Sequence, residues 1–479
     1  MAGGLGTPRR VNRHAAPVSA HGWGPGGTTL DPDTTGGPAA PRSSPLFSGP
    51  FPANPHGRPP RPPARPGAVG PVDAGPAGPA SLGRMPRFEP FHALRYAPQT
   101  DLDAVIAPPY DVLSDADVEA LKARDPHNIA WVDDPRGGDD RYERAAATLR
   151  QWLAEGVMVP DERPSLTIYR MAFTDATGAD RVISGVLGGL EVVDEGAGGV
   201  LPHERTTKKA VTDRLDLTRA TATNGSPVWG LSPAPGLTEA LREPAEPVGG
   251  ITVDGVRHTV ERVTDPQRIA AISAIIGSDD VLIADGHHRY AISRSYRDEV
   301  RAATGRTDTD AELTLTFVNE LVDDQLSIEA IHRLLDGIAW DDLVAALERF
   351  FTLEPLDGGP TPATLAAMVA RGRLVLLSPD GRASWLIARP GAFDGVRALD
   401  GAWLERALDG TSAVLGYQHG LDEMLEAVGD HAAGILIRPT GLDEIMRTAR
   451  EGLLMPPKST FFTPKLRTGF VMRPTASLG

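Results

Sequence analysis

The chain changes composition sharply at residue 84, and this break bounds the part that can fold. The first 84 residues hold 18 of the 44 prolines and 16 of the 52 glycines. A segment of this composition buries too little apolar surface to offset the entropy lost on ordering. We therefore expect residues 1–84 to be disordered and residues 85–479 to form the globular body. Met85 opens the sequence MPRFEPFHALRYAP, typical of a natural start, so a mis-assigned start codon is one interpretation of the preceding segment, and a functional basic tail is the less favoured alternative.

The globular body is acidic. Residues 1–84 carry eight Arg and three Asp, a charge of +5, so residues 85–479 carry −20 of the net charge of −15. Sequence-independent binding to DNA or RNA depends on positive charge, which argues against a nucleic-acid partner. The absence of cysteine excludes disulfides, thiolate catalysis and Cys-ligated metals. Because the sequence also shows no membrane-length apolar run and no apolar signal region, we expect a cytoplasmic protein.

Helical and strand periodicities alternate from residue 85 onward. Ser114 and Asp117 form a capping-box variant at the start of one predicted helix. Asp254-Gly255 and Asp380-Gly381 predict the turns of two hairpins. Helices are predicted over 114–126, 141–156, 265–277, 340–351 and 361–372, and strands over 165–173, 181–193, 281–285, 311–322 and 432–439. The mixture predicts an α+β (mixed α/β) fold rather than a doubly wound parallel sheet.

The predicted strand VLIAD runs directly into GHHRY, where a helix should begin. A helix start offers unpaired N–H groups and a positive dipole end, Gly286 lets a ligand approach the backbone, and Arg289 is a two-pronged donor. His287 and His288 can donate to an anion or carry a proton near neutral pH. As a metal-binding pair they are poor, because neighbours on a helix point about 100° apart. The alternative is a plain helix start, with the preceding Asp285 as its N-cap.

A second polar segment, PHERTTKKAVTDR, begins at Pro202. Glu204 can accept a proton or hold Mg²⁺. Arg205, Lys208 and Lys209 can neutralise phosphate oxygens. The alternative is an exposed charged helix whose ion pairs contribute little stability.

A third segment, MPPKSTFFTPKLRTGFVMRP, is rich in turns yet apolar. We expect it to pack back onto the body and to present Lys458, with Ser459 and Thr460, to a ligand; the alternative is a packed terminal loop. Lysine usage supports a role for both segments. The chain has five Lys against 43 Arg, and four of the five lie in these two segments. Lys is a compact point charge and Arg a planar fork, so these positions favour Lys geometry.

Five blocks resemble, in order, those of domain of unknown function family 1015: IAPPYDVLS, PHERT followed by DRLDLTRA and NGSPVW, IADGHHRY, IHRLL, and MPPKSTFFTPKLRTG. The resemblance spans about residues 86–474. The D-G-H-H-R block is also similar to the phosphate-binding signature of the ParB/sulfiredoxin superfamily, some members of which are free-serine kinases. This resemblance implies a ParB/sulfiredoxin-like core with family-specific elaborations. It also implies that Gly286 and Arg289 lie against the phosphates of ATP, ADP or CTP.

One position departs from the family pattern. Members often carry Glu after HHRY, where this chain has Ala291, so an acid or metal role there would fall to Glu204 or Asp285. The sequence thus predicts a nucleotide-dependent phosphotransferase acting on a small hydroxylated metabolite such as serine, or the reverse or hydrolytic reaction. Mg²⁺ would bridge to Glu204 or Asp285. The alternatives are a ParB-like nucleotide-binding regulator without turnover, and a metal-dependent hydrolase in which His203 and Glu204 meet the histidine pair.

Overall fold

The structure is a computed structural model that describes residues 85–175, 179–202, 209–453, 455 and 458–476. The disorder expected of residues 1–84 lies outside these ranges. So do His203, Glu204, Arg205 and Lys208, whose roles stay predictions.

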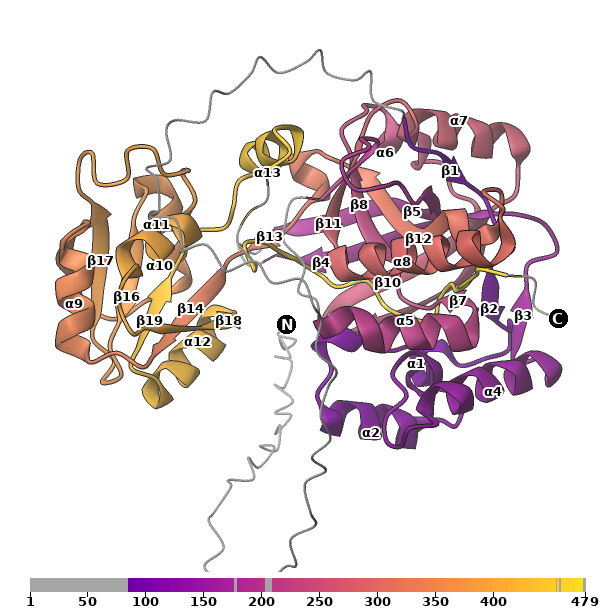
Figure 1. The fold of residues 1–479 in the computed structure, drawn as a ribbon, viewed down its shortest axis with the longest axis horizontal. Helices are drawn as coiled ribbons and strands as arrows, with labels where there is room; N and C mark the ends of the chain where they lie inside the picture. Colours follow the sequence, from indigo (N-terminus) through magenta and orange to yellow (C-terminus); the bar gives the residue numbers. More distant parts are fainter. Residues whose placement is uncertain (1–84, 176–178, 203–208, 454, 456–457, 477–479) are drawn as a thin grey trace, which may run out of the picture. The chain divides into compact units, whose positions relative to one another are not determined.

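A nine-stranded mixed sheet is the largest one in the described part of the chain (Figure 1). In spatial order its strands are β6 (Val200–Leu201), β11 (Val281–Asp285), β8 (Val228–Ser232), β12 (Leu313–Glu320), β5 (Asp180–Glu191), β4 (Leu166–Thr174), β10 (Val256–Val263) and β9 (Glu246–Val253), with β1 (Phe88–Glu89) paired to β5. Strand β11 is parallel to β6, and β12 is parallel to β8; the other neighbouring pairs are antiparallel. The predicted α+β class is therefore confirmed. The ParB/sulfiredoxin-like core stays a prediction.

Strand β11 is apolar without alternation because both faces of the sheet are covered. Val281 and Ile283 pack in one hydrophobic core, and Leu282 and Ala284 pack in the other. A buried strand of this kind reads as a continuous apolar run. Asp285, its last residue, is the one polar side chain of β11 and is less buried than the rest. The strand thus ends with a carboxylate at the edge of the core.

A six-stranded sheet has its own two hydrophobic layers. Its strands are, in order, β15 (Phe351–Leu356), β17 (Ala383–Ala388), β16 (Leu374–Leu377), β19 (Ala433–Leu436), β14 (Ile331–Asp336) and β18 (Val414–His419), all paired antiparallel. Strands β16 and β17 form the second predicted hairpin. Three further two-stranded pairs are β2 (Leu94–Tyr96) with β3 (Met158–Pro160), β13 (Ile328–Glu329) with β20 (Phe461–Phe462), and β7 (Thr223–Asn224) with β21 (Arg473–Pro474).

The helices of the described chain are α1 (Leu102–Val105), α2 (Asp115–Arg124), α3 (Ala130–Asp133), α4 (Arg141–Ala154), α5 (Lys209–Thr221), α6 (Leu237–Ala240), α7 (Pro266–Ile276), α8 (His287–Thr304), α9 (Trp340–Glu348), α10 (Pro362–Arg371), α11 (Asp400–Leu408), α12 (Leu421–Ala427) and α13 (Leu442–Arg450). The five helices predicted by residue range are present among them, as α2, α4, α7, α9 and α10. The capping box of Ser114 and Asp117 is present at α2. At the β9–β10 turn, Asp254 and Gly255 have φ of 52° and 74°, as a type I′ turn requires. No described helix is long and apolar enough to cross a bilayer.

The C-terminal segment packs back onto the body, as predicted. Backbone bridges join Met472 to Leu94 and Thr468 to Ala107. Phe470 and Val471 are buried in the same core as the end of β11. This return brings the C-terminal segment to the carboxyl end of β11, where Lys465 contacts Asp285.

Candidate functional site

The site is centred where β11 ends and α8 begins. Helix α8 starts at His287, and its N-cap is Gly286 with φ of 84°, in the left-handed region that favours glycine. A Cβ at Gly286 would lie 3.1 Å from the Arg289 guanidinium and 3.3 Å from the Cα of Val228. The alternative in which Asp285 caps the helix is therefore wrong. Because glycine has no capping side chain, the first-turn N–H groups rely on other acceptors, and an anion suits them.

Asp285 forms ion pairs with two cations. Lys465 Nζ lies 2.7 Å from Asp285 Oδ1, and Arg289 Nη2 donates to Oδ2. Burial alone would raise the pKa of Asp285, but the charges of Lys465, Arg289 and His287 outweigh burial and hold that pKa well below its usual range. The carboxylate is therefore ionised at physiological pH. It acts as a fixed negative charge and is a poor proton acceptor.

Arg289 joins three distant segments. Besides Asp285, its guanidinium donates to the carbonyl of Pro227, and Nη2 lies 3.2 Å from Asp111 Oδ2. Its side chain is 9% exposed. Its Nε is buried and has no hydrogen-bond partner among the described residues. Arg289 lines a cavity of about 40 Å³ with hydroxyl and charged side chains, including Ser293, large enough for ordered water. Arg289 therefore holds Asp285, Asp111 and the Pro227 carbonyl in fixed positions relative to one another.

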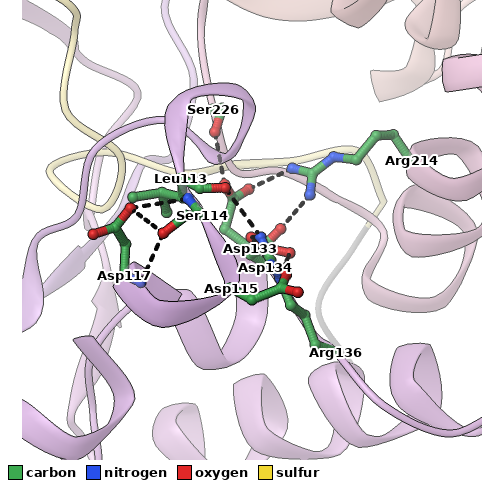
Figure 2. A network of polar contacts seen from close by, with 9 residues as sticks. All are labelled: Leu113, Ser114, Asp115, Asp117, Asp133, Asp134, Arg136, Arg214 and Ser226. Carbon is green, nitrogen blue, oxygen red and sulfur yellow. Dashed lines mark hydrogen bonds and ion pairs between the residues drawn. The ribbon is translucent and has the colours of Figure 1, made fainter. Parts of the chain in front are cut away.

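A second network holds the loop that carries Asp111 (Figure 2). Arg214 of α5 lies 2.8 Å from Asp133 Oδ1, and its guanidinium stacks 3.6 Å from the centre of the Tyr110 ring. Ser226 Oγ donates to the other Asp133 oxygen at 2.9 Å. Burial alone would lower the pKa of Arg214, but the charges of Asp133 and Tyr110 raise it above its ordinary value. Arg214 is therefore a permanent charge beneath the short 3₁₀ turn Tyr110–Val112.

Arg136 stabilises the C-terminal end of the Tyr110–Val112 turn. Arg136 donates to the carbonyl of Leu113 at 3.3 Å and also pairs with Asp134 at 2.7 Å. In Figure 2 the capping pair Ser114 and Asp117 lies next to these contacts. The Tyr110–Asp111 turn is thus held at both ends, and Asp111 stays within reach of Arg289.

The structure brings together residues from four of the quoted sequence blocks. Arg289 contacts IAPPYD through Asp111 and NGSPVW through Pro227, while Asp285 contacts PKLRTG through Lys465. The convergence of the first and third polar segments, which the sequence could not show, is therefore present. From the second segment, Arg214 reaches Tyr110.

Other predicted residues lie elsewhere or are not described. Lys465, rather than Lys458, reaches Asp285, and it also lies 4.6 Å from the centre of the Phe461 ring. Lys458 is exposed, with φ of 61°. The carbonyl of Ser459, which precedes Thr460, accepts a hydrogen bond from Thr440 Oγ1. The nucleotide-binding roles of Lys458, Ser459 and Thr460 stay predictions. So does that of Lys209, the first residue of α5, whose side chain lies outside the described part of the chain.

Two residues of the site, Tyr110 and Asp111, had no role in the sequence predictions, and Arg214 and Lys465 were predicted only as members of the two charged segments. Each stands in a block that was quoted for its resemblance or its charge. Their site partners are at least 81 residues away along the chain, from Arg214 with Asp133 at 81 to Lys465 with Asp285 at 180. Sequence patterns of local period carry no information about such pairs.

A metal site is not formed by the described residues alone. Among them, no three His, Asp or Glu side chains are grouped to hold a metal ion. Mg²⁺ commonly takes one or two carboxylates together with phosphate oxygens and water. Asp111 and Asp285 fit that pattern, because both accept from the same nitrogen, Arg289 Nη2. The hydrolase alternative needs His203 and Glu204, which lie outside the described ranges.

Solved structures show weak overall similarity. A mutant free serine kinase in complex with ADP is 15% identical, with a TM-score of 0.31 over 55% of this chain and 84% of that chain. A C-terminally truncated SbnI from Staphylococcus aureus is 12% identical, with a TM-score of 0.32 over 58% and 84%. A conserved hypothetical protein from Pyrococcus furiosus is 14% identical, with a TM-score of 0.30 over 55% and 87%. Scores this low support no conclusion about this chain.

No curated protein matches the sequence. A family model, in contrast, matches residues 88–402, which include the Tyr110 turn, Arg214 and the start of α8. The C-terminal segment with Lys465 follows the matched range. The chain belongs to the family described as "Protein of unknown function (DUF1015)".

Proposed function

We propose that the chain is a nucleotide-dependent phosphotransferase acting on a small hydroxylated metabolite such as serine, in the forward, reverse or hydrolytic direction. One observation carries the proposal. Asp285, Lys465, Arg289 and Asp111 converge at the glycine-capped start of the 18-residue helix α8. A helix N-terminus next to Lys and Arg is a site for phosphate oxygens.

The reaction needs positioning and charge neutralisation more than covalent chemistry. Lys465, at 19% side-chain exposure, is close to solvent and can move its ammonium from Asp285 to a phosphate oxygen. Arg289 is more buried and holds the surrounding loops. Lys465 therefore neutralises the charge of the transferring phosphoryl group. Arg289 holds the carboxylates of Asp111 and Asp285 in position beside that group.

The substrate hydroxyl must lose a proton. Asp285 is too acidic to take it, because its pKa lies well below the usual range. Asp111 is more exposed, at 41%, and contacts the same Arg289 nitrogen. We propose that Asp111 accepts the proton of the substrate hydroxyl. His287 or His288 then carries that proton to solvent. Mg²⁺, with the phosphate oxygens of the nucleotide, would be held by Asp285 or Glu204.

The test is turnover by the full chain. Purified protein is incubated with ATP or ADP and serine, or with phosphoserine in the reverse direction, and both nucleotide and amino acid are quantified. Lys465→Ala and Arg289→Ala should each lose about 10²–10³ of the rate, as removal of one charge-stabilising donor does elsewhere; His287→Ala should lose about 10²-fold, as loss of a positioned proton carrier does. Arg306→Ala is the control, because Arg306 is exposed and pairs with Asp308. Unchanged turnover in all three site variants would refute the proposed phosphotransferase site.

A regulator without turnover is the second candidate. The site cations already have carboxylate partners: Lys465 pairs with Asp285, and Arg289 with Asp285 and Asp111. A ligand that exchanges those partners would free the carboxylates of Asp111 and Asp285 from Arg289 and Lys465, which suits a switch. Calorimetry with ATP, ADP and CTP, run beside the turnover assay, separates the two. Binding without product supports the regulator.

A further inference from the structure

A separate cleft lies behind the turn that carries Asp111. Its volume is about 520 Å³, within the range of small-molecule sites. Helices α1 and α2, the β9–β10 turn and Arg467 contribute to its walls. The apolar lining includes Ile106, Pro108, Val112, Leu121, Ile251 and Val253. None of these residues has a part in the phosphate site.

The cleft and the phosphate site share two walls. Pro108 and Val112 line the cleft and flank Asp111 in the sequence, and Asp111 contacts Arg289. Arg467 lines the cleft and follows Lys465 by two residues. A backbone bridge between Ala107 and Thr468 ties the two segments together. A ligand in the cleft can therefore extend around the turn to the start of α8.

The charges in the cleft indicate which part of a ligand fits. Three carboxylates, on Asp103, Asp117 and Asp254, line the cleft with two guanidinium groups, on Arg124 and Arg467. The excess of negative charge repels a phosphate chain and suits an uncharged group with hydroxyl donors.

Arg467 lines the cleft and pairs with an exposed carboxylate. Its Nη2 lies 2.7 Å from Asp254, which is 76% exposed. Its Nε is buried and has no hydrogen-bond partner in the described part of the chain. Its backbone N–H donates to Tyr169 Oη at 3.0 Å, which fixes the residue in place. A planar guanidinium held in this way can stack on an aromatic ring or donate to a ring nitrogen.

We infer that this cleft binds the nucleoside part of the nucleotide, with the base against the apolar wall and the ribose hydroxyls toward the carboxylates. The phosphates then run past the Asp111 turn to the start of α8. This inference rests on the proposed function, since it assumes that the ligand at α8 is a nucleotide.

The test compares ligands that do and do not carry a nucleoside. Ala120 lies on the exposed face of α2 and lines the cleft, so Ala120→Trp fills it. Ala123 is exposed on the same helix and does not line the cleft, so Ala123→Trp is the matched control. Calorimetry on the full chain measures binding of ATP, adenosine and inorganic tripolyphosphate. Ala120→Trp should weaken ATP and adenosine by about tenfold or more and leave tripolyphosphate unchanged; Ala123→Trp should change none of them.

The outcomes separate the two proposals. Equal ATP affinity in the native chain and Ala120→Trp overturns the cleft assignment and leaves the phosphate site standing. A second result supports the cleft and overturns the phosphotransferase. In that result the native chain binds no tripolyphosphate and binds ATP no more tightly than adenosine, and Ala120→Trp abolishes the binding of adenosine. A native chain that binds none of the three overturns both.

Discussion

Replacing Asp285 by Asn tests whether one carboxylate holds the site together. The substitution keeps the shape of the side chain and removes the charge that Lys465 and Arg289 share. Their side chains are 19% and 9% exposed, so both cations would be left largely desolvated. Breaking a buried pair from one side costs about 3–5 kcal/mol. Because Asp285 is itself 23% exposed, we expect the lower end, about 3 kcal/mol of unfolding free energy.

The effect should depend on pH in a defined direction. The pKa of Asp285 in the folded chain lies below its ordinary value of 3.8. The unfolded chain therefore binds this proton first as pH falls, and the stabilisation by Asp285 is complete above about pH 5. It disappears only as pH falls through the folded-state pKa. The difference between the native chain and Asp285→Asn should thus stay constant from pH 7 to about pH 5 and shrink below about pH 4.

Urea unfolding at a series of pH values, followed by tryptophan fluorescence, to which the buried Trp229 contributes, measures both effects. Asp308→Asn is the control, because it breaks an exposed pair with Arg306 and should leave the midpoint unchanged. An Asp285→Asn midpoint equal to that of the native chain at pH 7 would refute the ion-pair account. A difference that grew toward acid pH would show that the pKa of Asp285 is raised.

Further variants test the other contacts. Gly286→Ala should cost at least about 1–2 kcal/mol of unfolding free energy, since its φ is left-handed and its Cβ would meet the Arg289 guanidinium; an unchanged urea midpoint would contradict this. Arg214→Lys keeps the charge but loses the planar stack on Tyr110, so we expect about 1.5–3 kcal/mol of destabilisation by the same measurement. Ser114→Ala removes the α2 cap and should cost about 1 kcal/mol, seen as a lower urea midpoint; an unchanged midpoint would contradict the role of this cap.

Local features of this fold follow from local sequence. The hairpin at Asp254-Gly255 and the capping box at Ser114 depend on residues within a few positions of each other, so their patterns predict them. The same holds for the start of α8, where a continuous apolar strand must end before a glycine. The alternative that placed the N-cap at Asp285 was wrong by one residue, because Asp is a good capping residue and the ion pairs of Asp285 depend on distant residues.

The sequence by itself determined that an anion-suited helix start follows a buried strand, that the body is acidic, and that lysine is reserved for a few segments. These properties follow from composition and local spacing. Only the tertiary structure decided which lysine meets Asp285, and that Arg289 faces Asp111 and Pro227. The physical reason is that these pairs are set by packing two faces of a mixed sheet and returning the C-terminal segment to it. Residues separated by 62 to 180 positions become neighbours only when that core forms.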